Sequence, residues 1–162
     1  MPYLNQNSLV EVNNLSLMNA KEIMDLIPNR YPILFIDRVD AMDPGKSITA
    51  TKNVTINENY FQGHFPGNPV MPGILIIESM AQVASILILK SPQFENKAVY
   101  MGSIRNAKFR KMVEPGDVLH FEVKIDKVRG SAGSVSCVAY VGDKKACEAQ
   151  LTFIVSAKER EE

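Results

Sequence analysis

The chain has 162 residues, 46% hydrophobic and 22% charged, which is the ordinary composition of one globular domain. Its 18 Lys and Arg residues balance 18 Asp and Glu residues, so neither nucleic acid nor a membrane surface is an expected partner. The polar residues 1–7 lack the basic start and apolar run of a signal peptide, and we expect a cytoplasmic protein. Within a single domain 1–162, residues 1–18 are expected to form an extension and residues 157–162 a loose polar tail.

The first third of the chain predicts a short helix and two strands. Asn19 can cap the helix, Glu22 occupies the capping-box position, and Pro28 ends it. The segments 33–39 and 46–56 are rich in residues that favour strands. They are separated by the turn sequence Asp43-Pro44-Gly45.

The central segment 72–90 predicts a long helix that is buried all round. Its sequence, PGILIIESMAQVASILILK, places apolar residues on nearly every face, and Pro72 suits the first helical position. Such a helix lies either in a protein core or in lipid. An ionised Glu78 would be costly in the middle of a membrane, so we expect a core helix wrapped by a sheet.

The second half of the chain predicts antiparallel strands. Apolar and polar residues alternate over 118–126, and the segments 134–141 and 145–155 are joined by a Gly-Asp hairpin turn. Cys137 and Cys147 fall in these strands without CxxC spacing, which predicts buried thiols and no structural metal site. The fold class is therefore α+β, with an antiparallel sheet of about six strands wrapped around one long central helix.

The loop GHFPGNPVMPG, residues 63–73, is the part of the sequence best suited to chemistry. Histidine has a free pKa of about 6.5, which suits proton transfer near neutrality. Gly and Pro around His64 fix an irregular backbone and leave room for a ligand. A lone histidine more often fills a turn, but a rigid loop just before a helix favours a general base. We also expect a cis bond between Phe65 and Pro66.

Glu78 is the candidate acid. It lies in the second turn of the central helix among apolar residues, and burial raises the pKa of a carboxyl group, which can then donate a proton to a leaving hydroxyl. Gln82 and Ser85, four and seven residues further on, share its face and could orient it. The competing interpretation is a buried Glu that pairs with Lys or Arg.

Gly73 lies in the first turn of this helix, where a free N–H points outward with the positive end of the helix dipole. Such a donor stabilises a thioester oxygen that gains enolate charge, although Pro-Gly is also common where ordinary helices begin. A base, an acid and an oxyanion donor fit the removal of a proton next to a carbonyl and of water from the next carbon. No phosphate loop or nucleophile elbow is present, and the thioester acidifies its own α-carbon, so no cofactor is expected.

These residues closely resemble the FabZ-type family, the 3-hydroxyacyl-(acyl-carrier-protein) dehydratases of type II fatty acid synthesis. The resemblance covers residues 19–156 and is most specific in the loop 63–73 together with Glu78. It includes further short motifs along the chain, namely Asn29-Arg30-Tyr31-Pro32, Asp37-Arg38, Glu78-Ser79-Met80-Ala81-Gln82, Phe109-Arg110 and Pro115-Gly116-Asp117.

The resemblance implies a hot-dog fold and the conversion of a (3R)-3-hydroxyacyl thioester on acyl carrier protein to the trans-2-enoyl thioester. His64 would remove the α-proton and Glu78 would protonate the 3-hydroxyl, the two coming from opposite subunits of a homodimer, with three dimers in a homohexamer. The sister dehydratase–isomerase family carries Asp at the position of Glu78, so no isomerisation is expected. The acyl chain would lie in a tunnel near the dimer interface, lined or gated by Phe65, Pro72 and Tyr100.

A basic stretch without acidic residues runs from Lys97 to Val113. Acyl carrier proteins are acidic, so this stretch is a candidate docking patch. A solvated strand face is the competing interpretation. The candidate docking residues are Arg105, Lys108, Arg110 and Lys111.

Two other functions stay open at this point. A hot-dog thioesterase would activate water with a carboxylate and release free thiol, whereas dehydration creates the ultraviolet absorbance of a 2-enoyl thioester. A non-catalytic acyl-binding domain would bind the thioester without turnover and would have no need of His64 together with Glu78.

Overall fold

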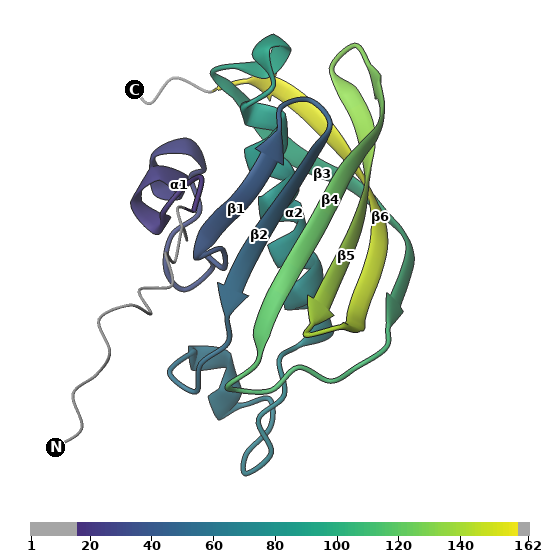
Figure 1. Cartoon of the computed structure of the whole chain (residues 1–162). Helices are drawn as coiled ribbons and strands as arrows, with labels where there is room; N and C mark the ends of the chain where they lie inside the picture. Colours follow the sequence, from purple (N-terminus) through teal and green to yellow (C-terminus); the bar gives the residue numbers. More distant parts are fainter. Residues whose placement is uncertain (1–15, 159–162) are drawn as a thin grey trace, which may run out of the picture.

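The structure, a computed structural model, describes residues 16–158. Within them, one antiparallel sheet curls around the helix α2 (Gly73–Leu89), with the strand order β1-β2-β4-β5-β6-β3 (Figure 1). This arrangement confirms the predicted α+β class and hot-dog fold. The strands are β1 (Arg38–Asp43), β2 (Ser47–Asn53), β3 (Lys97–Phe109), β4 (Val118–Arg129), β5 (Ala132–Val141) and β6 (Lys144–Ala157).

The helix α2 forms the centre of the core. It packs against β2, β3, β4, β5 and β6, and Met80, Val83 and Leu87 on it are fully buried. Pro72 is its N-cap, so the helix begins one residue later than predicted. The 3-10 helices η1 (Asn59–Gln62) and η2 (Pro92–Phe94) precede and follow it along the chain. No helix within residues 16–158 is long and apolar enough to cross a membrane.

The short helix α1 (Ala20–Leu26) lies beside β1, outside the sheet (Figure 1). Its predicted capping box is confirmed. The Glu22 N–H donates to Asn19 Oδ1 at 3.0 Å, and the Asn19 N–H donates to the Glu22 carboxylate at 2.7 Å. The helix ends two residues before Pro28, and the fully buried side chain of Ile23 attaches it to the core.

The predicted strand over 33–39 is wrong in its first part, because β1 begins only at Arg38. A side chain from α2 bonds the backbone of the preceding segment instead. The Phe35 N–H donates to Gln82 Oε1 at 2.9 Å, and Gln82 Nε2 donates to the Ile33 carbonyl at 2.6 Å. Backbone groups satisfied in this way are not available to a strand ladder, so strand propensity is overridden by a tertiary contact.

The C-terminal half confirms the predicted hairpin. β5 and β6 are joined by the Gly142-Asp143 turn, in which Gly142 has a φ of +60°. The strand β3, which stood out in the sequence only by its basic residues, is 13 residues long and pairs with β6. Its other edge pairs with no strand in the described part of the chain.

Cys137 on β5 and Cys147 on β6 are buried free thiols, as predicted. Burial, together with the negative charge of Asp126, raises the pKa of Cys137 to about 12. Burial and the charge of Glu148 raise the pKa of Cys147 to about 11. Both thiols are therefore protonated and unreactive near neutral pH.

The described part of the chain begins close to the core. Met18, inside the expected extension 1–18, is buried and exchanges two backbone hydrogen bonds of 3.3 and 3.0 Å with Val39. The division into extension, domain and tail stays a prediction, because it falls largely on residues 1–15 and 159–162, which lie outside the described residues.

Candidate active site

The loop 63–72 leads into α2 at the bottom of Figure 1. At its tip, residues 65–68 form a turn closed by two backbone hydrogen bonds of 3.0 and 2.9 Å. Pro66 occupies the second position and Gly67, with a φ of +75°, the third, as in a type II turn. Proline at the second position of such a turn is trans, so the expected cis bond before Pro66 is wrong. The cis peptide bonds of the described residues are Tyr31–Pro32 and His64–Phe65.

The ring of His64 is held in one tautomer. Its Nδ1 lies 2.6 Å from the carbonyl oxygen of Val70. A carbonyl oxygen can only accept a hydrogen bond, so in the neutral ring Nδ1 carries the hydrogen and Nε2 keeps its lone pair. The ring also stacks on Phe65, with centroids 4.0 Å apart, and the His64 N–H donates to the Tyr60 carbonyl at 3.0 Å. Nε2 of His64 is therefore a positioned proton acceptor.

A groove of about 690 Å³ lies beside His64 at the beginning of α2. Gly73 lines it, and the Gly73 N–H bonds to no acceptor within residues 16–158. A Cβ at Gly73 would lie 2.6 Å from the ring of Phe109, so glycine is needed here for the close approach of that ring. The groove thus combines a proton acceptor with a free backbone donor at the positive end of a helix. Its apolar lining residues include Val70, Met71, Ile74, Ile76, Met112 and Val113.

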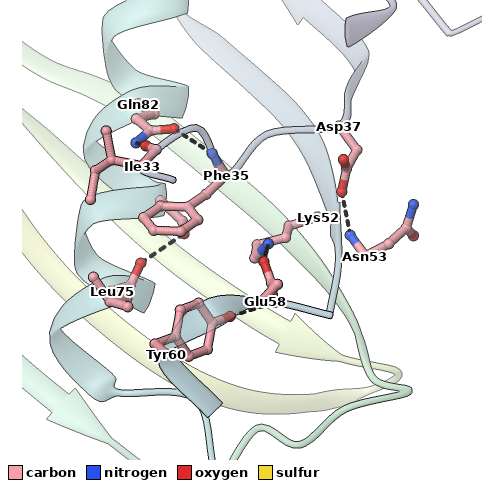
Figure 2. A network of polar contacts seen from close by, with 10 residues as sticks. Ile33, Phe35, Asp37, Lys52, Asn53, Glu58, Tyr60, Leu75 and Gln82 are labelled. Carbon is pink, nitrogen blue, oxygen red and sulfur yellow. Dashed lines mark hydrogen bonds and ion pairs between the residues drawn. The ribbon is translucent and has the colours of Figure 1, made fainter. Parts of the chain in front are cut away.

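The carboxyl group of Glu78 is bonded by Gln82. Glu78 is half-buried, and its Oε1 accepts a hydrogen bond of 3.0 Å from Gln82 Nε2. The orientation of the Gln82 amide follows from its other partners, because the Phe35 N–H can only donate and the Ile33 carbonyl can only accept. Figure 2 shows Gln82 beside these two residues. Ser85, expected on the same face, instead donates to the carbonyl of Ala81 at 2.9 Å.

The residues predicted from the sequence form two groups in a single chain. His64 and Gly73 line the groove, Phe65 stacks on His64, and Pro72 caps the adjoining helix end. Glu78 does not line this groove, and no hydrogen bond or ion pair joins it to His64 within residues 16–158. Tyr100 is 56% exposed on β3 and lines a different cavity, of about 490 Å³, between α1 and β3.

The predicted docking cations differ in their surroundings. Arg110 donates to Glu148 at 2.7 Å, and Lys111 Nζ lies 4.0 Å from Asp117. The hydrogen bond and charge of Glu148 raise the pKa of Arg110. Of the four predicted docking cations, Arg105 and Lys108 are exposed and form no ion pair in the described part of the chain.

A buried polar cluster next to the loop was missed in the sequence. Lys52 on β2 is only 3% exposed and pairs with Glu58, whose other oxygen accepts from the Tyr60 hydroxyl (Figure 2). In β2 the buried residues Ile48 and Ala50 alternate with less buried ones, and Lys52 continues their face of the strand. A lysine at a strand position whose side chain faces the core was therefore the feature of the sequence that could have indicated this cluster.

The fold is that of the hot-dog proteins, and a comparison of sequences defines the family. A family model described as a FabA-like domain matches residues 27–150. The chain belongs to the FabA-like family.

Curated relatives are similar to nearly the whole chain. A protein of Levilactobacillus brevis named 3-hydroxyacyl-(acyl-carrier-protein) dehydratase FabZ is 66% identical, over 88% of this chain and 97% of its own length. A protein of the same name from Lactiplantibacillus plantarum is also 66% identical, with the same coverage. Among solved structures, the dehydratase heterocomplex ApeI:P from Xenorhabdus doucetiae matches with a TM-score of 0.71 and 14% identity, over 84% of this chain and 91% of that one. This structural likeness supports the fold alone.

Proposed function

We propose that this chain dehydrates (3R)-3-hydroxyacyl thioesters of acyl carrier protein to trans-2-enoyl thioesters in fatty acid biosynthesis. The relatives named for the dehydratase support this, since they are 66% identical over 97% of their length. The groove supports it independently, because His64 and the free Gly73 N–H line the same space. The observation that carries the chemistry is the hydrogen bond from His64 Nδ1 to Val70, which leaves Nε2 free to act as a base.

In the proposed reaction His64 Nε2 takes a proton from the carbon next to the thioester carbonyl. The Val70 carbonyl then stabilises the imidazolium through Nδ1–H. The Gly73 N–H donates to the thioester oxygen as negative charge develops there. Glu78, held at Oε1 by Gln82, donates a proton from Oε2 to the 3-hydroxyl, which leaves as water. Transfer of the proton from His64 back to Glu78 resets the site, and no cofactor takes part.

A second copy of the chain is proposed to complete the site. The long edge strand β3 exposes Tyr100, Met101 and Ile104, and its outer edge is unpaired in the described part of the chain. Such an edge binds another strand readily, and two-fold symmetry makes pairing of β3 with itself the simplest arrangement. Because Glu78 and His64 do not meet in one chain, we propose that each site takes His64 from one subunit and Glu78 from the other.

The finer features follow from the family resemblance. Three dimers are proposed to form a hexamer, whose mass light scattering would measure. The acyl chain would run along the dimer interface, and the buried free thiols Cys137 and Cys147 suit a reducing cytoplasm. The residues assigned to the acyl tunnel and to carrier-protein docking are Phe65, Pro72 and Tyr100, and Arg105, Lys108, Arg110 and Lys111.

Turnover of a 3-hydroxybutyryl carrier-protein thioester by the purified protein tests the reaction. Dehydration predicts growth of the 2-enoyl absorbance without free thiol. Thiol release without enoyl product would identify a thioesterase, and binding without either product would identify an acyl-binding protein. Since the acid is Glu78, the product mixture is expected to contain no 3-enoyl isomer.

The sharing of the site between subunits has its own test. The variants His64→Ala and Glu78→Gln are each expected to be nearly inactive. When the two are coexpressed with different tags and purified through both, a mixed pair contains one site with both native groups. Recovery of activity is expected. If verified mixed assemblies stay inactive, His64 and Glu78 act within one chain and the shared site is wrong.

A further inference from the structure

A buried polar cluster is linked by contacts to His64 through Tyr60 and to Glu78 through Phe35 and Gln82. Lys52 Nζ pairs with Glu58, and the Tyr60 hydroxyl donates to the second carboxylate oxygen of Glu58 (Figure 2). Glu58 is the N-cap residue of η1 but makes no capping bond, since Lys52 and Tyr60 engage its side chain. The cluster is thus satisfied internally, and no fully buried side-chain nitrogen or oxygen within residues 16–158 lacks a partner.

One arm of the cluster reaches His64. The backbone carbonyl of Tyr60 accepts hydrogen bonds from the N–H groups of Gly63 at 3.3 Å and His64 at 3.0 Å, and so fixes where the catalytic loop begins. The ring of Tyr60 is itself held at its hydroxyl by Glu58 and at its edge by Phe35, with centroids 6.4 Å apart. A movement of Tyr60 would therefore move the backbone of His64.

The other arm reaches Glu78 through two intermediates. Lys52 Nζ lies 5.2 Å from the centroid of the Phe35 ring, within cation–π distance. The Phe35 N–H donates to Gln82 Oε1 at 2.9 Å, and Gln82 Nε2 donates to Glu78 Oε1 at 3.0 Å. Figure 2 shows Phe35 between Gln82 on one side and the Lys52–Glu58–Tyr60 cluster on the other. The carboxyl group of Glu78 is thus held by a chain of contacts that begins at the cluster.

Resting on the proposed function, we infer that Lys52, Glu58 and Tyr60 are positioning residues for both His64 and Glu78. These two groups of one chain would serve different sites of the dimer. The cluster of each subunit would therefore position His64 in one site and Glu78 in the other. Displacement of a reacting group by about 1 Å can slow a reaction by about 100-fold, which makes such anchoring consequential. Burial, and then the hydrogen bond and charge of Glu58, raise the pKa of Tyr60, so its hydroxyl stays a donor near neutral pH.

Tyr60→Phe tests the inference by removing one oxygen while keeping the ring and the backbone carbonyl. We expect kcat to fall about tenfold, with KM within about twofold, because the substrate contacts are kept while the catalytic groups lose their anchor. Ser91→Ala is the matched control, since it also removes one hydroxyl, which is buried and donates to the Leu87 carbonyl at 3.0 Å beyond the far end of α2. It should lower the melting temperature to a similar extent and leave kcat unchanged.

Two outcomes of this pair would overturn the inference. The first is a kcat of Tyr60→Phe within about twofold of the native value. The second is an equal loss of kcat in Tyr60→Phe and Ser91→Ala at equal loss of melting temperature, which would show a general effect of destabilisation.

The mixed assemblies separate the two arms. In a chain that carries His64→Ala, an added Tyr60→Phe can act on the one native site only through Glu78. In a chain that carries Glu78→Gln, it can act only through His64. Both placements should lower the recovered activity by about threefold or more. A loss with only one placement would contradict the two-armed role, whereas failure to recover activity before Tyr60→Phe is added would contradict the shared site itself.

Discussion

The polar side chains of α2 bond in two different ways. Gln82, near the middle of the helix, bonds backbone groups that lie 47 and 49 residues away along the chain and also holds Glu78. The serines bond locally, since Ser79 and Ser85 donate to carbonyls of their own helix at 2.7 and 2.9 Å, and Ser91, just past the helix end, donates to a carbonyl four residues earlier at 3.0 Å. After Gln82, the side chains of the helix other than Ser85 are apolar and buried.

This difference separates packing from positioning within one helix. Burial of apolar surface is not directional and is satisfied by any well-filled core. A hydrogen-bonded network is directional, and its energy depends on distances and angles. Substitutions among the apolar residues 83–89 of α2 should therefore change stability and spare the chemistry, while those around Glu78 should change turnover more than stability.

The largest effect is expected for His64→Ala, at the end of the molecule where α2 begins. Loss of a general base lowers kcat by about 10²–10⁴-fold, while the half-buried ring contributes little to the core. The melting temperature should stay close to the native value, and steady-state kinetics on the carrier-protein substrate measure the loss. His120→Ala is the matched control, because His120 lies on β4, away from the groove. A near-native rate for His64→Ala would show that another group is the base.

Leu87→Ala probes the apolar segment 83–89 of α2. Leu87 is fully buried, and truncation in a core costs roughly 2–5 kcal/mol of unfolding free energy. Urea denaturation at fixed protein concentration should show this loss, whereas kcat at 25 °C should stay within about twofold of the native value, since Leu87 touches no group of the groove. A strong drop in kcat of the folded variant would mean that packing and positioning are not separable in α2.

The sequence predicted those features that depend on near neighbours. The capping box of Asn19 and Glu22, the Gly142-Asp143 turn and the alternation in β4 each involve residues a few positions apart, and all are present. Such local patterns carry their own geometry, because a turn or a cap needs particular residue types at fixed spacing.

The contacts of Gln82 with the segment 33–35 could not be predicted, for the opposite reason. Its partners at Ile33 and Phe35 are backbone groups, which every residue possesses, so their side chains do not mark the contact. The strand propensity of 33–37 pointed to a ladder that the fold does not form. The assignment of His64 and Glu78 to opposite subunits came from the family resemblance alone, because no spacing in one chain relates residues of two different chains.

Gln82→Leu is expected to affect both activity and stability, because Gln82 is buried and also holds Glu78. It leaves the buried Phe35 N–H and Ile33 carbonyl without a partner, which costs roughly 1–3 kcal/mol. It also releases Glu78, so kcat should fall about tenfold. Kinetics and urea denaturation of the same preparation measure both. Ser85→Ala, one turn further along, should change neither by much. Native kcat in Gln82→Leu would show that Glu78 needs no orienting partner.

The smallest effect is expected for exposed charges on the surface, which contribute neither to core packing nor to the hydrogen bonds that position Glu78. Arg105→Glu with Lys108→Glu should raise KM for the carrier-protein substrate by roughly two- to fivefold for each charge, because exposed charges attract weakly. The effect should fade with added salt and be absent with a pantetheine thioester, which carries no protein.

Lys127→Glu with Arg129→Glu, on the exposed end of β4, is the matched control. Arg110 is a poorer probe, since reversing it also breaks its pair with Glu148. An equal rise in KM from both double variants would show a general effect of charge and no docking patch on β3.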